Sequence, residues 1–286
     1  MPAGDMFRFD AKRVLVVGGA SGIGEAASRI LAELGAEVVV MDINDSPQAG
    51  LDTIRVDLRS EESIDTAVAT LDGNVDAILS CAGVADRGFP QVEVFQINFI
   101  GQRHLIESVL ERGWLAPGSA IGMISSLAGF GWQAHHRVLR ELLQTEAFDA
   151  ASQWASALEA PAGVPVYAVS KQVVNAYCAW RAPALGRERI RINATAPAPT
   201  QTPLLAATPA WVDRGTEFEA VMGRPAATPD EQALPLVFLC SDAASFVSGE
   251  VLHVDAGLMG GSTSGALSEG FGLTLAERLV YQEVTR

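Results

Sequence analysis

The sequence contains few cysteines, little positive charge and no long apolar run. Three cysteines occur among 286 residues, in an odd number and without a CxxC pair, which disfavours a disulfide framework and leaves no cluster of metal ligands. We therefore expect a protein of the reducing cytoplasm with no bound metal. The 34 acidic and 20 basic residues give a net charge of −14, which argues against binding of nucleic acid or of an anionic membrane.

We expect neither a membrane-spanning segment nor a signal peptide in this sequence. No apolar run reaches the ~18 residues that a membrane helix requires, and the first stretch, MPAGDMFRFDAKR, has no apolar core of a signal peptide. The sequence does contain enough apolar residues for a sizeable hydrophobic core, because 49% of its residues are hydrophobic and 19% are charged. The composition predicts a globular protein, and we expect one domain over residues 1–286.

Short β-branched runs alternate along the chain with segments of helical spacing. Residues 13–17 and 37–41 have the pattern of buried strands, and residues 25–34 between them have that of a helix, so the two strands should pair in parallel. Further strands are expected at 53–56, 75–80, 119–124, 190–195 and 250–254, and further helices at 60–71, 95–112, 167–185 and 230–239. This alternation predicts an α/β fold, a Rossmann-type doubly wound parallel sheet of six to seven strands.

Two segments interrupt the alternation. Residues from about 131 to 163 are rich in Ala, Gln and Leu, and they predict one or two extra helices before the helix at 167–185. Residues from about 259 to 286 form a C-terminal extension, in which 273–284 has the pattern of a short amphipathic helix. The expected core therefore carries a helical insert and a tail.

Three glycines lie in the loop between the first strand and the first helix. Gly18, Gly22 and Gly24 have the spacing GxxxGxG. A dinucleotide pyrophosphate needs a turn without side chains, so that backbone N–H groups can approach it, and a helix N-terminus whose dipole favours negative charge. Glycine also serves turns for conformational reasons alone. The strand–loop–helix placement nevertheless favours a dinucleotide site, and the absence of GK[ST] excludes a P-loop.

Acidic residues follow the second and third strands, where the adenosine of a dinucleotide would lie. Asp42 comes about 20 residues after the glycines, and its carboxylate would accept hydrogen bonds from the ribose hydroxyls. The same charge would repel a 2′-phosphate, and no Arg or Lys lies in the glycine loop or directly after Asp42. We therefore expect NAD rather than NADP. Asp57 is expected to reach the adenine amino group, with a turn or capping role as the alternative for both residues.

Tyr167 and Lys171 stand four residues apart in YAVSK. On a helix this spacing places both side chains on one face, one turn apart. An ammonium group beside the phenol would lower the tyrosine pKa, so that the pair could exchange a proton with a substrate oxygen. The same spacing also arises by chance in a pair of surface residues. The motif therefore indicates a catalytic pair only because the glycine loop occurs in the same chain.

Together these segments resemble the short-chain dehydrogenase/reductase family over residues from about 11 to 257. The resemblance implies a catalytic tetrad in which Tyr167 exchanges the proton and Ser126, rather than Ser125, holds the substrate oxygen. Lys171 would lower the tyrosine pKa and bind the nicotinamide ribose, and Asn98 would anchor a water of the proton relay. The matching segments are GGASGIG at 18–24, Asp42, VDL at 56–58, CAG at 81–83, Asn98, ISS at 124–126, YAVSK at 167–171 and RINATAP at 191–197.

The resemblance also implies the contacts of an NAD cofactor. Thr202 would contact the nicotinamide carboxamide, and a mobile lid over the substrate is expected at about 203–225. The implied cofactor-binding residues are Gly18, Ser21, Gly22, Ile23, Gly24, Asp42, Asp57, Leu58, Cys81, Ala82, Gly83, Tyr167, Lys171, Pro197, Thr200 and Thr202.

The insert resembles that of bacterial 3α-hydroxysteroid dehydrogenase/carbonyl reductases, a group that also includes coniferyl-alcohol dehydrogenases. In that group the insert covers a helix face that other members use for tetramer assembly, so we expect a homodimer, with a homotetramer as the alternative. His135 and His136 lie in the insert without further ligands, which favours surface or packing roles over metal binding. Three tryptophans either line a hydrophobic substrate mouth or pack in the core: Trp132, Trp154 and Trp211.

The expected activity is that of an NAD-dependent oxidoreductase. Its partner would be a small hydrophobic alcohol or ketone, of steroid, terpenoid or aromatic type. One alternative is a non-catalytic dinucleotide-binding subunit on the same fold, although Tyr167 and Lys171 are both present. A second alternative is a dehydratase or epimerase that uses the same tetrad without net change in NADH.

Overall fold

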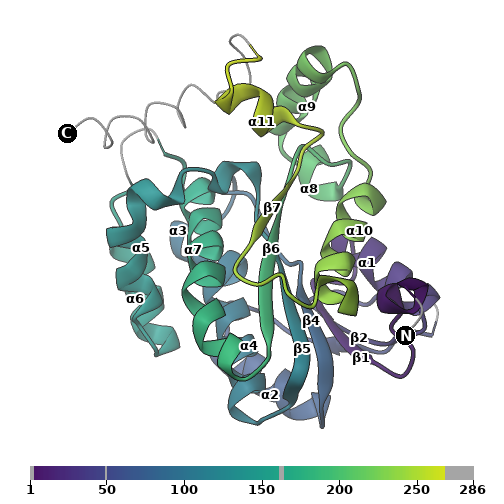
Figure 1. Ribbon diagram of the computed structural model, residues 1–286. Helices are drawn as coiled ribbons and strands as arrows, with labels where there is room; N and C mark the ends of the chain where they lie inside the picture. Colours follow the sequence, from purple (N-terminus) through teal and green to yellow (C-terminus); the bar gives the residue numbers. More distant parts are fainter. Residues whose placement is uncertain (1–2, 49, 161–163, 268–286) are drawn as a thin grey trace.

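A computed structural model describes residues 3–48, 50–160 and 164–267, and within these residues seven parallel strands form the centre of the molecule (Figure 1). The sheet has the order β3-β2-β1-β4-β5-β6-β7. The strands are β1 (Arg13–Val17), β2 (Glu37–Asp42), β3 (Thr53–Arg55), β4 (Val75–Ser80), β5 (Leu115–Ile124), β6 (Arg191–Pro197) and β7 (Val251–Val254). The predicted Rossmann-type sheet of six to seven parallel strands is confirmed.

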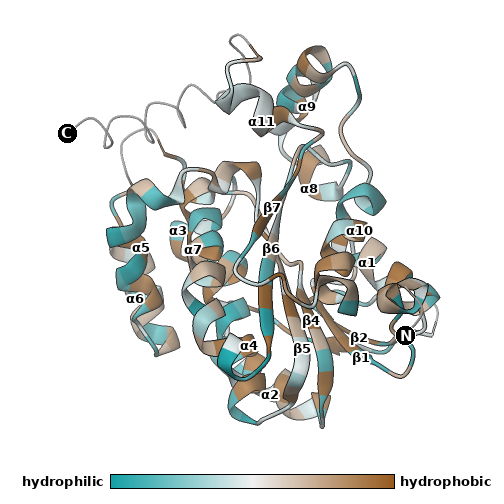
Figure 2. Ribbon diagram, in the orientation of Figure 1, coloured by the Kyte–Doolittle hydropathy of each residue, from teal (hydrophilic) through white to brown (hydrophobic). Residues whose placement is uncertain are grey.

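Helices cover both faces of this sheet (Figure 1). Alternate side chains of each strand enter the two layers, since Leu15 and Val17 of β1 join one core cluster and Val14 and Val16 join the other. The strands β1, β2 and β4 are mostly apolar, as strands covered on both faces should be, whereas β6 also carries hydrophilic residues (Figure 2). One layer holds α1 (Gly22–Glu33) and α10 (Pro229–Cys240), and the other holds α2 (Glu61–Leu71), α4 (Gly101–Glu111) and α7 (Val166–Arg187).

The strand order reverses at β1, which lies between β2 and β4. From β1 the chain adds β2 and β3 on one side of the sheet. It then crosses back and adds β4 to β7 in order on the other side. In open α/β sheets this reversal leaves a crevice beyond the carboxyl ends of the strands, where ligands bind. The loops that follow β1 to β6 therefore meet at one edge of the sheet.

The helix expected at 95–112 is interrupted. It begins earlier, as α3 (Gln91–Phe95), widens into a π-helical turn at Gln96–Ile100 and continues as α4. Such wide turns are rare and occur often at functional sites. This one carries Asn98, whose side chain is fully buried.

The insert and the segment after β6 add helices outside the alternation. The insert contains the extra helices that were predicted, α5 (His136–Leu143) and α6 (Phe148–Ala157), after a short turn at Trp132–His135. Leu139, Leu142 and Phe148 of these helices join the core of the α4 and α7 layer. After β6, α8 (Pro203–Ala206) and α9 (Pro209–Met222) form the segment that we call the lid.

The C-terminal part continues from β7 into α11 (Leu258–Thr263). The amphipathic pattern at 273–284 lies outside the described residues. Short 3-10 turns complete the elements, at Ala3–Phe7, Leu127–Gly129 and Asp242–Ala244. Among the residues that the structure describes, no helix has both the length and the apolar character needed to cross a bilayer.

Candidate active site

The loop between β1 and α1, residues 18–24, has glycine where no side chain fits. Gly18 has φ +80°, and a Cβ there would collide with the backbone of Ala82. A Cβ at Gly24 would collide with the carbonyl group of Gly18, and one at Gly22, where φ is +57°, would lie 3.2 Å from Cγ2 of Thr202. The loop is therefore packed closely against the β4 loop and Thr202, and its glycines bring backbone rather than side chains to these contacts.

This loop leads directly into the N-terminus of α1. Ser21 precedes the helix, and its side chain makes no capping hydrogen bond. The N–H groups of the first helical turn have no partner within the helix itself, so they suit an anion. A cavity of about 750 Å³ opens beside them. A cradle of bare backbone next to a helix N-terminus fits the pyrophosphate of a dinucleotide.

The cavity gathers almost all of the residues singled out from the sequence. Of the predicted catalytic and cofactor-binding residues, only Gly24 and Asn98 lie behind its wall rather than on it. Cys81 is among the lining residues, and burial raises the pKa of its thiol, so that it stays protonated. Its place fits a small side chain beside the cofactor.

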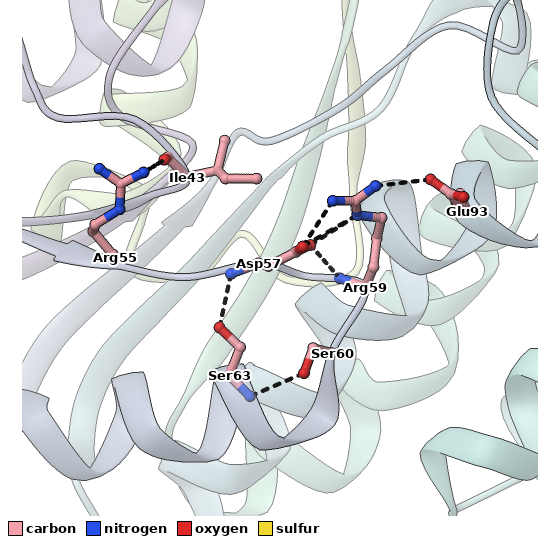
Figure 3. Close-up of polar contacts among 7 residues, drawn as sticks. All are labelled: Ile43, Arg55, Asp57, Arg59, Ser60, Ser63 and Glu93. Carbon is pink, nitrogen blue, oxygen red and sulfur yellow. Dashed lines mark hydrogen bonds and ion pairs between the residues drawn. The ribbon is translucent and has the colours of Figure 1, made fainter.

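Asp42 ends β2 and braces the glycine loop. Its Oδ2 accepts the N–H of Ala20 at 3.0 Å, and its Oδ1 accepts the N–H of Asn44 at 2.9 Å. The carboxylate also lines the cavity, as a ribose-binding group must. A cation nevertheless stands nearby: Arg55 of β3 is the register partner of Asp42, and its Nη2 donates to the carbonyl oxygen of Ile43 at 2.7 Å (Figure 3).

Asp57 is held by a residue that sequence analysis did not single out. The Nε and Nη2 of Arg59 donate to its two carboxylate oxygens at 2.9 and 2.8 Å (Figure 3). The hydrogen bonds from the Arg59 side chain lower the pKa of Asp57. Nη1 of Arg59 reaches Oε2 of Glu93 at 2.9 Å, so the guanidinium lies between two carboxylates. Asp57 still lines the cavity, but it is already bridged to Arg59.

Tyr167 and Lys171 lie one turn apart on α7, and both line the cavity. Nζ of Lys171 lies over the tyrosine ring, 5.9 Å from its centroid, and donates to the carbonyl oxygen of Ile124 at 2.9 Å. Burial lowers the pKa of Lys171 to about 8. Burial also raises the pKa of Tyr167 to about 12, although a hydrogen bond with Ser126 opposes the rise.

The expectation that Lys171 lowers the pKa of Tyr167 stays a prediction. The ammonium group lies over the ring and donates to the carbonyl oxygen of Ile124. The group that lowers the phenol pKa is the hydroxyl of Ser126. At neutral pH the site holds a protonated phenol next to a hydroxyl, which can together hold a substrate oxygen and give it a proton.

The two adjacent serines differ in what they can reach. Ser126 lines the cavity, and its Oγ accepts the N–H of Ala128 at 3.1 Å. Ser125 is buried, and its Oγ donates to the carbonyl oxygen of Lys171 at 3.2 Å. The structure thus pairs Ser126 with Tyr167 and gives Ser125 a role in fixing α7.

Asn98 lies in the π-helical turn and fixes the β4 loop. Its Oδ1 accepts the N–H of Val84 at 2.8 Å, and its Nδ2 donates to the carbonyl oxygen of Val84 and to Oγ of Ser170, both at 3.0 Å. A Cβ on Gly83 would lie 3.4 Å from Nζ of Lys171 and 3.5 Å from Oδ1 of Asn98. A larger side chain at position 83 would therefore contact both Asn98 and Lys171.

The part of the cavity around Tyr167 is apolar and reaches the lid. The ring of Trp211, on α9, meets that of Tyr167 edge-on, with 4.7 Å between centroids. Phe89, Phe130 and Leu205 line the same cavity. Of the three tryptophans with two possible roles, Trp211 is thus the one that lines the site.

The other aromatic and histidine candidates support the fold. Trp154 meets Phe95 edge-on and donates from Nε1 to Glu141 at 3.2 Å, and Trp132 packs against the core. His135 bonds the side chain of Gln172, and His136 bonds the carbonyl oxygen of Gln133. Within the described residues, no group of three or more His, Cys, Asp or Glu side chains is arranged to hold a metal ion.

Comparisons with known proteins agree with this arrangement. A family model described as short chain dehydrogenase matches residues 12–138, and one described as enoyl-(acyl carrier protein) reductase matches residues 149–259. Coniferyl-alcohol dehydrogenase of Pseudomonas sp. strain HR199 is 31% identical over 252 residues, which cover 86% of this chain and 96% of that protein. Cis-4-hydroxycyclohexanecarboxylate dehydrogenase of Sinomonas cyclohexanicum is 34% identical over 273 residues, with 86% and 96% covered.

A solved structure shares the fold along its whole length. It is the 3-alpha-hydroxysteroid dehydrogenase from Pseudomonas sp. B-0831 complexed with NADH. The two chains are 27% identical with a TM-score of 0.73, and the match covers 90% of this chain and 100% of that one.

Proposed function

The chain belongs to the short-chain dehydrogenase family, and from this membership we propose that it is an NAD-dependent oxidoreductase that interconverts a secondary or aryl alcohol and its carbonyl compound. The observation that carries the proposal is that Tyr167, Ser126 and Lys171 line the same cavity as the glycine loop. A dinucleotide site and a proton-exchanging phenol in one space are what hydride transfer to or from an alcohol carbon requires.

The cofactor assignment rests on the chain's own residues. The glycine-rich loop of residues 18–24 would hold the pyrophosphate, Asp42 the adenosine ribose, and Thr202 the nicotinamide end. When bound, the nicotinamide supplies the hydride acceptor or donor. The carboxylate of Asp42 favours a ribose with free hydroxyls, and a related structure contains NADH.

Proton exchange would be the task of Tyr167. With a pKa of about 12 it is protonated at neutral pH, which suits proton donation to a carbonyl oxygen during reduction. In the oxidation direction the same oxygen would receive the proton of the alcohol. Ser126 would hold the substrate oxygen beside the phenol. Lys171, whose ammonium group lies against the ring of Tyr167, would bind the nicotinamide ribose.

The substrate class follows from the walls around Tyr167. Aromatic and aliphatic side chains line the cavity there, with Trp211 directly against the tyrosine ring, and the charged residues Asp86 and Arg214 also line it. Flat apolar walls suit a substrate whose alcohol stands on a ring, since rings bury much apolar surface against aromatic side chains. The relatives named for coniferyl alcohol, hydroxycyclohexanecarboxylate and hydroxysteroid substrates support a ring-bearing alcohol.

A Tyr167→Phe variant tests the proposal. We expect kcat for alcohol oxidation with NAD to fall about 10²- to 10⁴-fold, because the proton acceptor is lost while the ring packing against Trp211 stays. Tyr177→Phe is the matched control, since Tyr177 lies on the same helix but bonds Glu107 away from the cavity. Activity is followed as NADH absorbance over a panel of cyclic and aryl alcohols.

Two results would contradict the proposal. The first is a Tyr167→Phe variant as active as the Tyr177→Phe control. The second is turnover of substrate with no net change in NADH, which would indicate the dehydratase or epimerase alternative. Binding of NAD without any turnover of the panel would favour the non-catalytic alternative.

A further inference from the structure

Three carboxylates line the cavity, and they differ in what they bind within the protein. They belong to Asp42, Asp57 and Asp86. Asp42 accepts two backbone N–H groups, and Asp57 is bridged to Arg59. Within the parts of the chain that the structure describes, no hydrogen bond or ion pair holds the carboxylate of Asp86. Asp86 is therefore the cavity carboxylate that is left to meet a ligand.

The loop between β4 and α3, residues 81–90, holds Asp86 in place. Val84 is bonded through both its N–H and its carbonyl oxygen to the side chain of Asn98, and the next residue, Ala85, is buried. Further along the loop, Phe89 belongs to the apolar wall of the cavity. The backbone that carries Asp86 is thus anchored immediately before it, which suits a residue that must hold a substrate group in a fixed position.

Asp86 lies close enough to Tyr167 for its charge to act on the phenol. Burial is the main cause of the raised pKa of Tyr167, and the negative charge of Asp86 adds to the rise. The carboxylate therefore belongs to the part of the cavity where the reacting alcohol would be held, and not to the adenosine end at Asp42.

We propose that Asp86 is a specificity residue that accepts a hydrogen bond from a second hydroxyl group of the substrate, so that cyclic alcohols with two hydroxyl groups are preferred. The inference rests on the proposed function and deepens it. A substrate that fills the cavity displaces water from this carboxylate. A second hydroxyl replaces the lost hydrogen bond, whereas a substrate without a donor leaves a charge unpaired in an apolar space.

A hydroxyl group fits this position better than an ammonium group does. Lys171 lines the same cavity, and its pKa of about 8, lowered by burial, keeps it mostly protonated at neutral pH. A second ammonium group would be repelled by this charge and would lose more hydration than a hydroxyl group on entering the cavity. The hydroxyl group still forms a charge-assisted hydrogen bond with the carboxylate, and it brings no net charge.

The test compares each cyclohexanediol isomer with its monomethyl ether, which keeps one reacting alcohol but cannot donate from the second oxygen. For the wild type with NAD, we expect kcat/KM of at least one diol to exceed that of its ether about 10- to 100-fold. Asp86→Ala should remove this difference, and Asp86→Asn should keep part of it, because the amide oxygen still accepts a hydrogen bond. The ratio between the two substrates cancels any effect of the lost charge on the pKa of Tyr167.

Arg87→Ala is the matched control. Arg87 is the next residue of the same loop, and its side chain is exposed and does not line the cavity. Its replacement should leave the ratio of diol to ether activity as it is in the wild type. Equal losses in Arg87→Ala and Asp86→Ala would mean that the loop, rather than the carboxylate, sets the preference. A wild type that prefers aminocyclohexanols to the diols would also overturn the inference.

A binding measurement separates this inference from the proposed function. Calorimetric titration with the diol and with its ether, in the presence of NADH, needs no turnover. We expect the wild type to bind the diol about tenfold more tightly than the ether, and Asp86→Ala to bind both alike. Equal binding of the two compounds, or binding of neither, would overturn the role of Asp86, and NAD-dependent oxidation of the ethers would leave the oxidoreductase proposal standing. A wild type that shows the difference in binding but oxidises no alcohol would overturn the proposed activity instead.

Discussion

Lys171 shows how a buried charge depends on contacts that a motif does not specify. The four-residue spacing from Tyr167 predicted that both side chains share a helix face, and they do. It did not predict that the ammonium group would donate to the carbonyl oxygen of Ile124 at the end of β5, because that bond depends on how α7 packs against the sheet. Burial, rather than the tyrosine, dominates the lysine pKa.

This burial predicts a pH-dependent stability. The pKa of Lys171 is about 8 in the folded protein, below its ordinary value of 10.5, so between these values the unfolded chain binds more protons. The free energy of unfolding should therefore rise as the pH rises through 8 toward 10. We expect urea unfolding between pH 7 and pH 9.5 to show a gain on the order of 1 kcal/mol that is absent in Lys171→Met.

Lys12→Met is the control for this experiment, because Lys12 is the chain's other lysine, directly precedes β1 and does not line the cavity. The control should retain the gain between pH 7 and pH 9.5. A wild-type profile that is parallel to that of Lys171→Met over this range would contradict the role given to burial.

Arg55 and Arg59 mark the limit of sequence analysis at the residue scale. Asp42 and Asp57 were found because each directly follows an apolar run in the sequence. The pairing of β2 with β3 brings Arg55 beside Asp42, which is 13 positions away in the sequence. Contact with α3 brings Arg59 to Glu93, which is 34 positions away. Aligning the ends of neighbouring parallel strands would have placed Arg55 beside Asp42.

At the scale of elements, strands and helices were predictable where their apolar period is strong. The π-helical turn was not, because Gln96–Ile100 continues the helical pattern and the wide turn follows from contacts made by Asn98 with Val84 and Ser170. A tertiary network thus decides the local geometry. The insert was recognised by its interruption of the alternation, and its two helices are present.

The lid contributes its own prediction through α9. Trp211 covers the ring of Tyr167, so Trp211→Ala should enlarge the cavity and remove an apolar wall for a ring-bearing substrate. We expect KM for a cyclic alcohol to rise about tenfold, which corresponds to about 1.4 kcal/mol of lost contact. Less burial should also bring the pKa of Tyr167 down from about 12, which would move the alkaline limb of the pH–rate profile to lower pH.

Val212→Ala is the matched control, since Val212 is the next residue on α9 and its side chain is 46% exposed. It changes the lid helix without changing the wall of the cavity. Steady-state kinetics over the pH range separate the two variants. Equal effects of both would mean that lid packing, rather than the contact with Tyr167, sets the affinity.

At the scale of the whole molecule, the position of the site follows from the order of the strands. Parallel strands on both sides of the reversal at β1 direct their following loops to one edge, so residues from the six loops that follow β1 to β6 meet there. The alternation in the sequence was enough to predict this edge. The alternation did not predict which residues cover the outer surface of the helices. The insert changes only this outer surface and leaves the order of strands and helices in the sheet as it is.

The insert leads to a prediction about assembly. Its helices α5 and α6 pack on the layer of α4 and α7, where Leu142 is fully buried and its carbonyl oxygen accepts a hydrogen bond from Arg103 of α4 at 2.9 Å. A helix face that is covered within one chain cannot also pack against a second copy. We expect light scattering over a dilution series to give twice the mass of one chain, and a mass of four chains would mean that assembly uses another surface.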